Sequence, residues 1–231
     1  VCINYGGRDE IVRAARRFAA LCMEGSCRPE ELTVPLLRKV IASIFYGDML
    51  VALRSQTHAY ENHRGDADAM TEKWISTIQG WIRGDKNYSA HDMKRRFYDI
   101  AADYATIPIT RVPKVKVGVV GEIYVKYSPL GNNDLEKFLE SQDCEVNLPG
   151  LMGFVEYCVA NYKLDIDLYG GNKLVAGGAD AFWSWLDGIG CASYDAMRKY
   201  GFYAPGSFRE LMKKPEGIIS LGAKMGEGWL L

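Results

Sequence analysis

The stretch KVKVGVVGEIYVKYSPLGNNDLEKFLESQDCEVNL, residues 114–148, decides the fold. Its β-branched first part, Lys114–Val125, predicts a strand, and the apolar run VGVVG is typical of an internal strand of a parallel sheet covered on both faces. A loop over 127–133, a helix over about 134–142 and a second strand at Cys144–Leu148 follow. A strand, a crossover helix and a second strand in this order predict a βαβ unit.

The segments on both sides of this unit predict helices. Thr33 is the predicted N-cap of a long apolar helix that contains Pro35 in its first turn, and a polar loop is expected over 55–64. Further helices are predicted from Asp66 or Asp68 to about Gly84, at about Ala90–Tyr104, and over about 150–163, 172–187, 193–201 and 206–213. The fold class is therefore α/β and helix-rich, with a parallel-sheet βαβ core and an N-terminal helical part.

Composition changes near 107–113, where Pro108 and Pro113 flank a connector. We therefore expect a helix-rich N-terminal part over 1–107 and an α/β part over 114–231. The chain starts without Met and ends on an apolar triplet, so we expect it to be part of a larger protein or oligomer.

The bulk composition excludes several classes of protein. The 231 residues are 48% hydrophobic and 25% charged, which is ordinary for a globular protein with a real core. A net charge of -1 gives no global field to attract nucleic acid, and no run of about 18 apolar residues predicts a membrane span. Six scattered cysteines without a C-x-x-C pair fit a reducing cytoplasm better than a disulfide scaffold.

Polar residues gather where the first strand of the βαβ unit is expected to end. Glu122 supplies an acceptor or base, Lys126 a cation, and the amides of Asn132 and Asn133 lie at the start of a helix. Such a set could hold an anionic or carbonyl-bearing group. The alternative is purely structural, with Pro129 and Gly131 making a turn and an asparagine capping the helix. The spacing lacks the G-x-G-x-x-G dinucleotide fingerprint.

Three other features attract attention. The glycine-rich segment around Glu227 and Trp229 predicts a loop close to a ligand or partner, or a loop that awaits a partner strand. His58 and His63 are interpreted as surface histidines, and no metal site is predicted. Asp48 lies within an apolar helix, where a charge must be paired or face a cleft unless it marks a polar helix edge.

The residues also resemble a known family over about 33–231. The matching segments are LTVPLLRKVIASIFYGDMLVALR, AYENHRGDADAMTEKW, VPKVKVGVVGEIYVKYSPLGNNDLEKFLE, VNLPGLMGFVEYC and MGEGWLL. They are similar to the dehydratase-like part of the 2-hydroxyacyl-CoA dehydratase and CoA-substrate-specific activase family. The resemblance implies doubly wound α/β domains with added helices, a CoA thioester ligand, an ATP-dependent activator subunit and an iron–sulfur cluster. The cysteines that hold the cluster are expected outside this chain.

Residues 1–32 resemble a different family. The segment INYGGRDEIVRAARRFAALCMEGSCRPEELT is similar to cis-prenyltransferases of the undecaprenyl diphosphate synthase type. That resemblance implies that Asn4 and Arg8 contact a diphosphate. The aspartate-bearing and arginine-rich segments of the family are absent from this sequence.

Three functional hypotheses follow. The first is a component of the dehydratase and activase system, in which Glu122, Lys126, Asn132 and Asn133 line a cleft that Glu227 and Trp229 close. The second is a non-catalytic interaction module of a larger assembly, since no complete catalytic set is evident. The third is a relationship to prenyl diphosphate synthases. In each case we expect a cytoplasmic protein without nucleic-acid partners.

Overall fold

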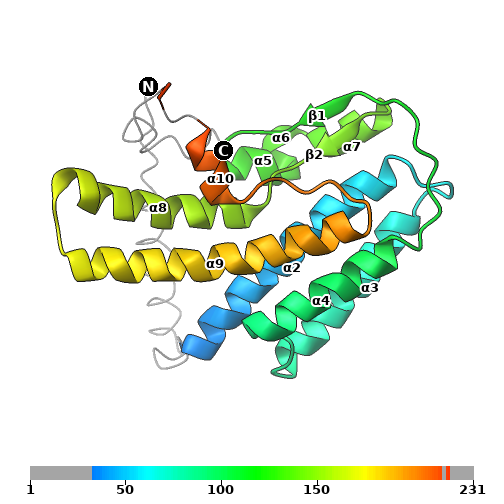
Figure 1. Cartoon of the computed structure of the whole chain (residues 1–231). Helices are drawn as coiled ribbons and strands as arrows, with labels where there is room; N and C mark the ends of the chain where they lie inside the picture. Colours follow the sequence, from blue (N-terminus) through cyan, green and yellow to red (C-terminus); the bar gives the residue numbers. More distant parts are fainter. Residues whose placement is uncertain (1–32, 215–216, 219–231) are drawn as a thin grey trace.

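The structure is a computed structural model that describes residues 33–214, 217 and 218 (Figure 1). The described elements, in chain order, are α2 (Val34–His58), α3 (Asp66–Arg83), α4 (Ala90–Tyr104), β1 (Lys116–Gly118), α5 (Ile123–Tyr127), α6 (Pro129–Asn132), α7 (Leu135–Ser141), β2 (Glu145–Asn147), α8 (Leu151–Tyr169), α9 (Lys173–Lys199) and α10 (Phe208–Lys213). Most of the described chain is helical, beside a small two-stranded sheet. The predicted helix-rich α/β class is thus confirmed.

The long helix α2 begins as predicted and ends later than predicted. The Thr33 hydroxyl accepts a hydrogen bond from the Leu36 amide at 3.4 Å, and Pro35 lies in the first turn. The predicted loop over 55–64 is wrong at its start, because α2 continues to His58. The Gln56 amide donates to the Tyr203 carbonyl at 3.0 Å and accepts from the Tyr203 N–H at 2.7 Å. These hydrogen bonds to Tyr203 satisfy the Gln56 side chain, so the polar last turn of α2 stays helical although it is buried.

The main hydrophobic core lies between helices rather than on the sheet. It joins α2, α3, α4 and α9 through buried side chains that include Phe45, Leu53, Phe97, Ile100 and Leu186. The predicted helices α3 and α4 are confirmed, and the Ser89 hydroxyl caps α4 by accepting from the Asp92 amide at 3.1 Å.

Helix α9 is continuous from Lys173 to Lys199, so the predicted break between 187 and 193 is wrong. Its buried face carries Leu186, Ile189, Ala196 and Met197, which pack into the core with α2 and α4. Figure 1 shows α9 running beside α8 and across α2. This packing outweighs the low helix propensity of the glycines in that stretch.

The βαβ unit is confirmed, but its first strand is much shorter than predicted. β1 and β2 pair in parallel, with Val117 opposite Val146, and α5, α6 and α7 form the crossover. The predicted strand Lys114–Val125 is wrong after Gly118, since Gly121 has a φ of 145° and Ile123–Tyr127 is helical. The predicted covered internal strand is also wrong, because Lys116 and Gly118 are exposed.

The remaining predictions for this half fare better. The loop expected over 127–133 contains the short helix α6, for which Ser128 accepts from the Gly131 amide at 3.3 Å. The helix expected over 134–142 is confirmed as α7, and the second strand is confirmed as β2. Helix α8 continues past its predicted end at 163 to Tyr169.

The division into 1–107 and 114–231 stays a prediction. The structure adds that α9, from the second part, shares its core with α2 and α4 of the first. None of the helices within the described residues is long and apolar enough to cross a membrane.

Candidate functional site

A cavity of about 670 Å³ lies between α2, the βαβ unit, α8, α9 and the segment that leads to α10. Apolar side chains make up most of its lining, among them Phe45, Met49, Ile123, Met152, Phe154 and Phe208. Its ionisable lining groups are Asp48, Lys116, Lys126, Glu145, Glu156, Tyr194 and Tyr203. An apolar hollow of this size with a few polar groups is the usual form of a small-molecule site.

Asp48 joins α2 to the first turn of α8. One carboxylate oxygen accepts from the Leu151 amide at 2.8 Å and the other from the Met152 amide at 2.7 Å. These amides have no partner within α8, so a carboxylate from α2 completes the helix end and matches its positive pole. Burial raises the pKa of Asp48, while the two amides and Lys126 oppose that rise. Asp48 is therefore a paired charge at a cavity wall, which was one of the two predicted alternatives.

Gly150 allows this cap to form. A Cβ atom at this position would lie 2.5 Å from an Asp48 carboxylate oxygen. Atoms of this kind do not approach so closely, so any other residue at this position would displace the Asp48 carboxylate from the cap.

Lys126 is the cavity's buried cation. The residue is 7% exposed, and burial lowers the pKa of its ammonium group, although the Asp48 charge opposes this. Its Nζ atom lies 4.6 Å from the centre of the Tyr127 ring. Within the described part of the chain, Nζ has no hydrogen bond or ion pair within 4.0 Å.

Glu156 is an acid that titrates near neutral pH. Burial, with a further contribution from Asp187, raises its pKa to about 7, and the Trp183 indole N–H donates to its carboxylate at 3.4 Å. A carboxyl with this pKa at a cavity wall can give or take a proton at physiological pH.

Glu145 is held in place at the sheet. The Tyr60 hydroxyl donates to its carboxylate at 2.6 Å, and the Lys116 ammonium lies 3.2 Å from the same oxygen. The hydrogen bond to Glu145 raises the pKa of Tyr60 to about 12. These three groups satisfy one another, unlike Lys126.

The structure separates the four residues predicted at the βαβ loop. Only Lys126 lines the cavity. Glu122 caps α5 by accepting from the Tyr124 and Val125 amides, at 2.8 and 3.3 Å. The Asn132 side chain donates to the Lys126 carbonyl at 3.3 Å and accepts from the Leu135 amide at 3.2 Å.

Asn133 has a φ of 55° and ends α6, which is a turn role. The predicted ligand residues Glu227 and Trp229 lie outside the described residues, as do Asn4 and Arg8.

Sequence reasoning missed Glu156 and Tyr194. Glu156 is an acid inside the apolar run GFVEYCVA, which is the same signal that drew attention to Asp48. Tyr194 gives no comparable signal, because a tyrosine in an apolar helix is ordinary in a core.

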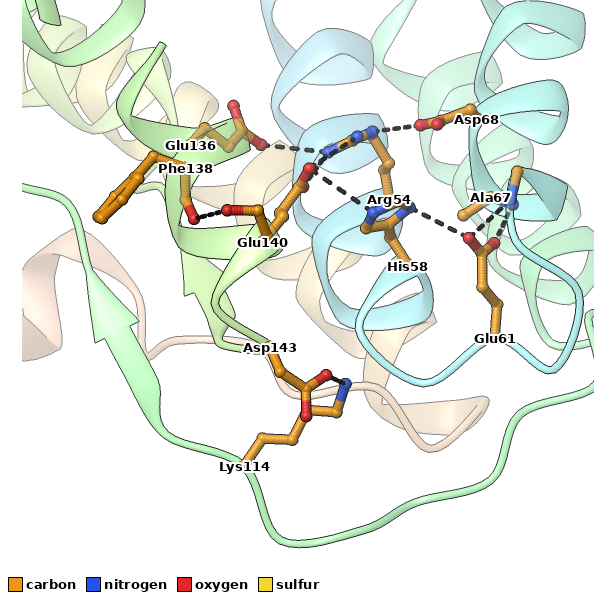
Figure 2. Close-up of polar contacts among 12 residues, drawn as sticks. Arg54, His58, Glu61, Ala67, Asp68, Lys114, Glu136, Phe138, Glu140 and Asp143 are labelled. Carbon is orange, nitrogen blue, oxygen red and sulfur yellow. Dashed lines mark hydrogen bonds and ion pairs between the residues drawn. The ribbon is translucent and has the colours of Figure 1, made fainter. Parts of the chain in front are cut away.

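A second charged cluster lies on another face of α2 (Figure 2). We call it the Arg54 cluster, and its members are Arg54, His58, Glu61, Asp68, Glu136 and Glu140. The Arg54 guanidinium donates to Asp68 at 2.6 Å, to Glu140 at 2.7 Å and to Glu136 at 3.2 Å. It thereby links α2 to α3 and α7.

His58 lies within this cluster. Its ring nitrogens are 3.1 Å from a Glu61 oxygen and 3.6 Å from a Glu140 oxygen, and its side chain is 11% exposed. The predicted surface position is therefore wrong for His58 and confirmed for His63, whose side chain is 78% exposed. Glu61 also accepts from the Gly65 and Ala67 amides, at 2.8 and 2.7 Å, and so fixes the start of α3.

The described residues do not fit an iron–sulfur cluster. Their cysteines are Cys144, Cys158 and Cys191, and burial raises the thiol pKa of the last two, which disfavours the thiolate that binds iron. No three or more His, Cys, Asp or Glu side chains of the described residues form a group that could hold a metal ion.

Comparison with known proteins gives one short match. Over 33 residues the chain is 58% identical to "Isoprenyl transferase 2" of Corynebacterium glutamicum, which covers 14% of this chain and 14% of that protein. The resemblance to cis-prenyltransferases is thus found over a short segment. No family model and no solved structure matches the chain.

Proposed function

We propose that the chain binds a CoA thioester, with the acyl group in the cavity, as a component of a 2-hydroxyacyl-CoA dehydratase and activase-type system. The observation that carries the proposal is the apolar cavity of about 670 Å³ with Lys126 in its wall. The iron–sulfur cluster and the ATP-dependent activator subunit of such a system would belong to other segments or subunits.

The apolar lining fits an acyl chain. Each methylene buried against Met49, Ile123 or Met152 contributes about 0.8 kcal/mol, which corresponds to roughly fourfold in affinity. The affinity should therefore increase with acyl length until the cavity is full, and free CoA should bind weakly.

Lys126 fits the polar end of such an acyl group. An ammonium that lacks a hydrogen-bond partner in the described structure gains one from the carbonyl oxygen of a thioester. The residue is 7% exposed, so this contact would form at a largely apolar wall. Glu156 lies on α8, three residues after Gly153, and also lines the cavity. It is the group that could exchange a proton with a bound ligand.

The 33-residue match favours a second candidate, the binding of an isoprenyl diphosphate. Its chain is also apolar, and its head group is an anion. The two candidates differ in the head group, so one panel of ligands separates them.

The test is isothermal titration with butyryl-, hexanoyl- and octanoyl-CoA, free CoA and geranyl diphosphate. We expect affinity to rise about fourfold per methylene, and free CoA to bind weakly. Equal affinities for free CoA and all acyl-CoAs would contradict the proposal. Binding of geranyl diphosphate alone would favour the second candidate, and no binding at all would favour an interaction module.

A pair of glycine variants provides the control. Gly153 lies on α8 at the cavity wall, and a Cβ there meets open space, so Gly153→Leu should occupy the cavity and abolish acyl dependence. Gly177 lies on α9 with equally open surroundings and does not line the cavity, so Gly177→Leu should bind as the unaltered protein does.

A further inference from the structure

The position of Lys126 suits a covalent reaction of its amine as well as an electrostatic contact with a ligand. It is a primary amine of a residue that is 7% exposed on the wall of an apolar cavity, and α5, the helix that carries it, is fixed at its start by Glu122. The Asn132 side chain donates to the Lys126 carbonyl, which fixes the backbone of the lysine itself. The backbone of Lys126 is therefore fixed by the fold, and its Nζ atom lies 4.6 Å from the centre of the Tyr127 ring.

The other lysine of the cavity provides a contrast. Lys116 has a side chain that is 66% exposed, and its ammonium is paired with Glu145 at 3.2 Å. Pairing with a carboxylate favours the charged ammonium, which is not a nucleophile. Lys126 is the less exposed of the two, and its ammonium has no such pairing within the described residues.

We propose that Lys126 is a covalent carbonyl-binding site, where its amine forms an imine with an apolar aldehyde or ketone whose chain occupies the cavity. The carbonyl carbon and Nζ form the C=N bond, the C=O bond breaks, and the oxygen leaves as water. Starting from the ammonium, the two protons in that water come from Nζ, so the protonated imine keeps the positive charge. Neither an oxidant nor a reductant is needed.

Two neighbours of Lys126 suit this chemistry. The Asp48 carboxylate interacts electrostatically with Lys126, so it balances the charge of a protonated imine as it balances the ammonium. Burial lowers the pKa of Lys126, so a larger fraction of the amine is neutral and nucleophilic at pH 7 than for an exposed lysine. The apolar lining retains the carbonyl compound beside the amine and limits hydrolysis of the imine by bulk water.

The experiment is reductive trapping of the full chain with octanal and cyanoborohydride at pH 7, followed by peptide mass spectrometry. Hydride reduces the imine to a stable secondary amine, which adds the octyl group to the lysine. We expect Lys126 to be labelled at least about tenfold faster than the exposed Lys73 and Lys137, because the cavity concentrates the chain beside the amine. Equal labelling of all three lysines would overturn the proposal.

Variants define the site. Gly153→Leu should slow labelling of Lys126 to the rate of Lys73, whereas Gly177→Leu should leave it unchanged. If Gly153→Leu left the rate at Lys126 unchanged, the cavity would not be the binding site and the proposal would fail. Lys126→Arg should remove the fast adduct, and the unaltered chain already tests the selectivity if that variant does not fold.

The outcome is independent of the proposed function, since octanal contains no CoA. Fast labelling of Lys126 without acyl-CoA binding would leave the imine site standing and remove the thioester proposal. Acyl-CoA binding with slow, unselective labelling would support the thioester proposal and rule out the imine site. If both hold, octanoyl-CoA should protect Lys126 from labelling.

Discussion

Two charged regions lie on different faces of α2, and they differ in how their charges are satisfied. In the Arg54 cluster one guanidinium donates to three carboxylates, as Figure 2 shows. In the cavity, Lys126 is 7% exposed and has no hydrogen bond within the described residues. The first arrangement connects helices, and the second leaves a donor for a ligand.

The pKa directions express the same difference. Burial lowers the pKa of Arg54, but the hydrogen bonds that its guanidinium donates to Glu140 and Asp68 outweigh this effect and raise the pKa overall. Burial also lowers the pKa of Lys126, and there the Asp48 charge does not outweigh it. For Arg54, the carboxylate partners change the pKa more than burial does, and the group has a structural role. For Lys126, burial has the larger effect on the pKa, and the group is a candidate functional residue.

Removing Arg54 should have the largest effect on this comparison. Arg54→Ala leaves Asp68, Glu136 and Glu140 without their cation, and we expect a loss of about 3–4 kcal/mol in the free energy of unfolding. Urea denaturation measures this loss. Lys137→Ala breaks an exposed pair with Asp134 and should cost at most about 0.5 kcal/mol. Equal losses for the two variants would remove the distinction between the Arg54 cluster and ordinary surface pairs.

A pH series tests the cavity side of the comparison. The pKa of Glu156 is raised from 4.5 to about 7, so between these values the folded state holds a proton that the unfolded state releases. The contribution of Glu156 to the free energy of unfolding is therefore fully present below pH 4.5. It is lost as the pH rises through 7, and the loss is about 3 kcal/mol.

Glu156→Gln should remove that part of the pH dependence, so the variant should gain stability relative to the unaltered protein as the pH rises from 5 to 8. Thermal denaturation at several pH values measures it. Glu72→Gln, on the exposed side of α3, should leave the dependence unchanged. A constant difference between Glu156→Gln and the unaltered protein across the series would contradict the assignment.

The smallest expected effect concerns the joint between α2 and α8. Gly150→Ala places a Cβ 2.5 Å from an Asp48 oxygen and should cost about 1–3 kcal/mol, because the cap must move. Gly153→Ala, in open space on the same helix, should instead stabilise by about 0.5–1 kcal/mol.

A double-mutant cycle sharpens this test. Asp48→Ala removes the cap and its own contribution, after which Gly150→Ala should have almost no additional cost. Denaturation of the two single variants and the double variant measures the coupling. Additive losses would show that the cost at Gly150 does not come from Asp48.

The elements that periodicity and local caps define were predictable from the sequence. The spacing of Trp74 and Ile78 located α3, and Ser89 and Thr33 mark helix starts by their own hydrogen bonds. The end of α2 was not predictable, since the partner of Gln56 is the distant residue Tyr203. The predicted length of the first strand was wrong for a similar reason. A β-branched run extends only as far as it has a neighbour, and β2 supplies three residues.

The site was predictable only in part. Lys126 was singled out as a cation at the expected end of a parallel strand and Asp48 as a charge within an apolar helix, and both line the cavity. Glu122, Asn132 and Asn133 looked similar in the sequence, but capping groups and ligand-binding groups have the same chemistry. Their partners in the structure tell them apart, and those partners are backbone atoms, as the alternative of a turn with a capping asparagine predicts.

The position of α9 in the core also has a consequence for protein synthesis. Its side chains Leu186, Ile189 and Met197 cover apolar faces of α2 and α4, which leave the ribosome earlier. At roughly 5–20 residues per second, those faces wait on the order of 5–20 seconds for their cover after α4 is complete. During that interval the nascent chain presents an unfinished core, so chaperone binding should concentrate on α2 and α4 and end once α9 has emerged.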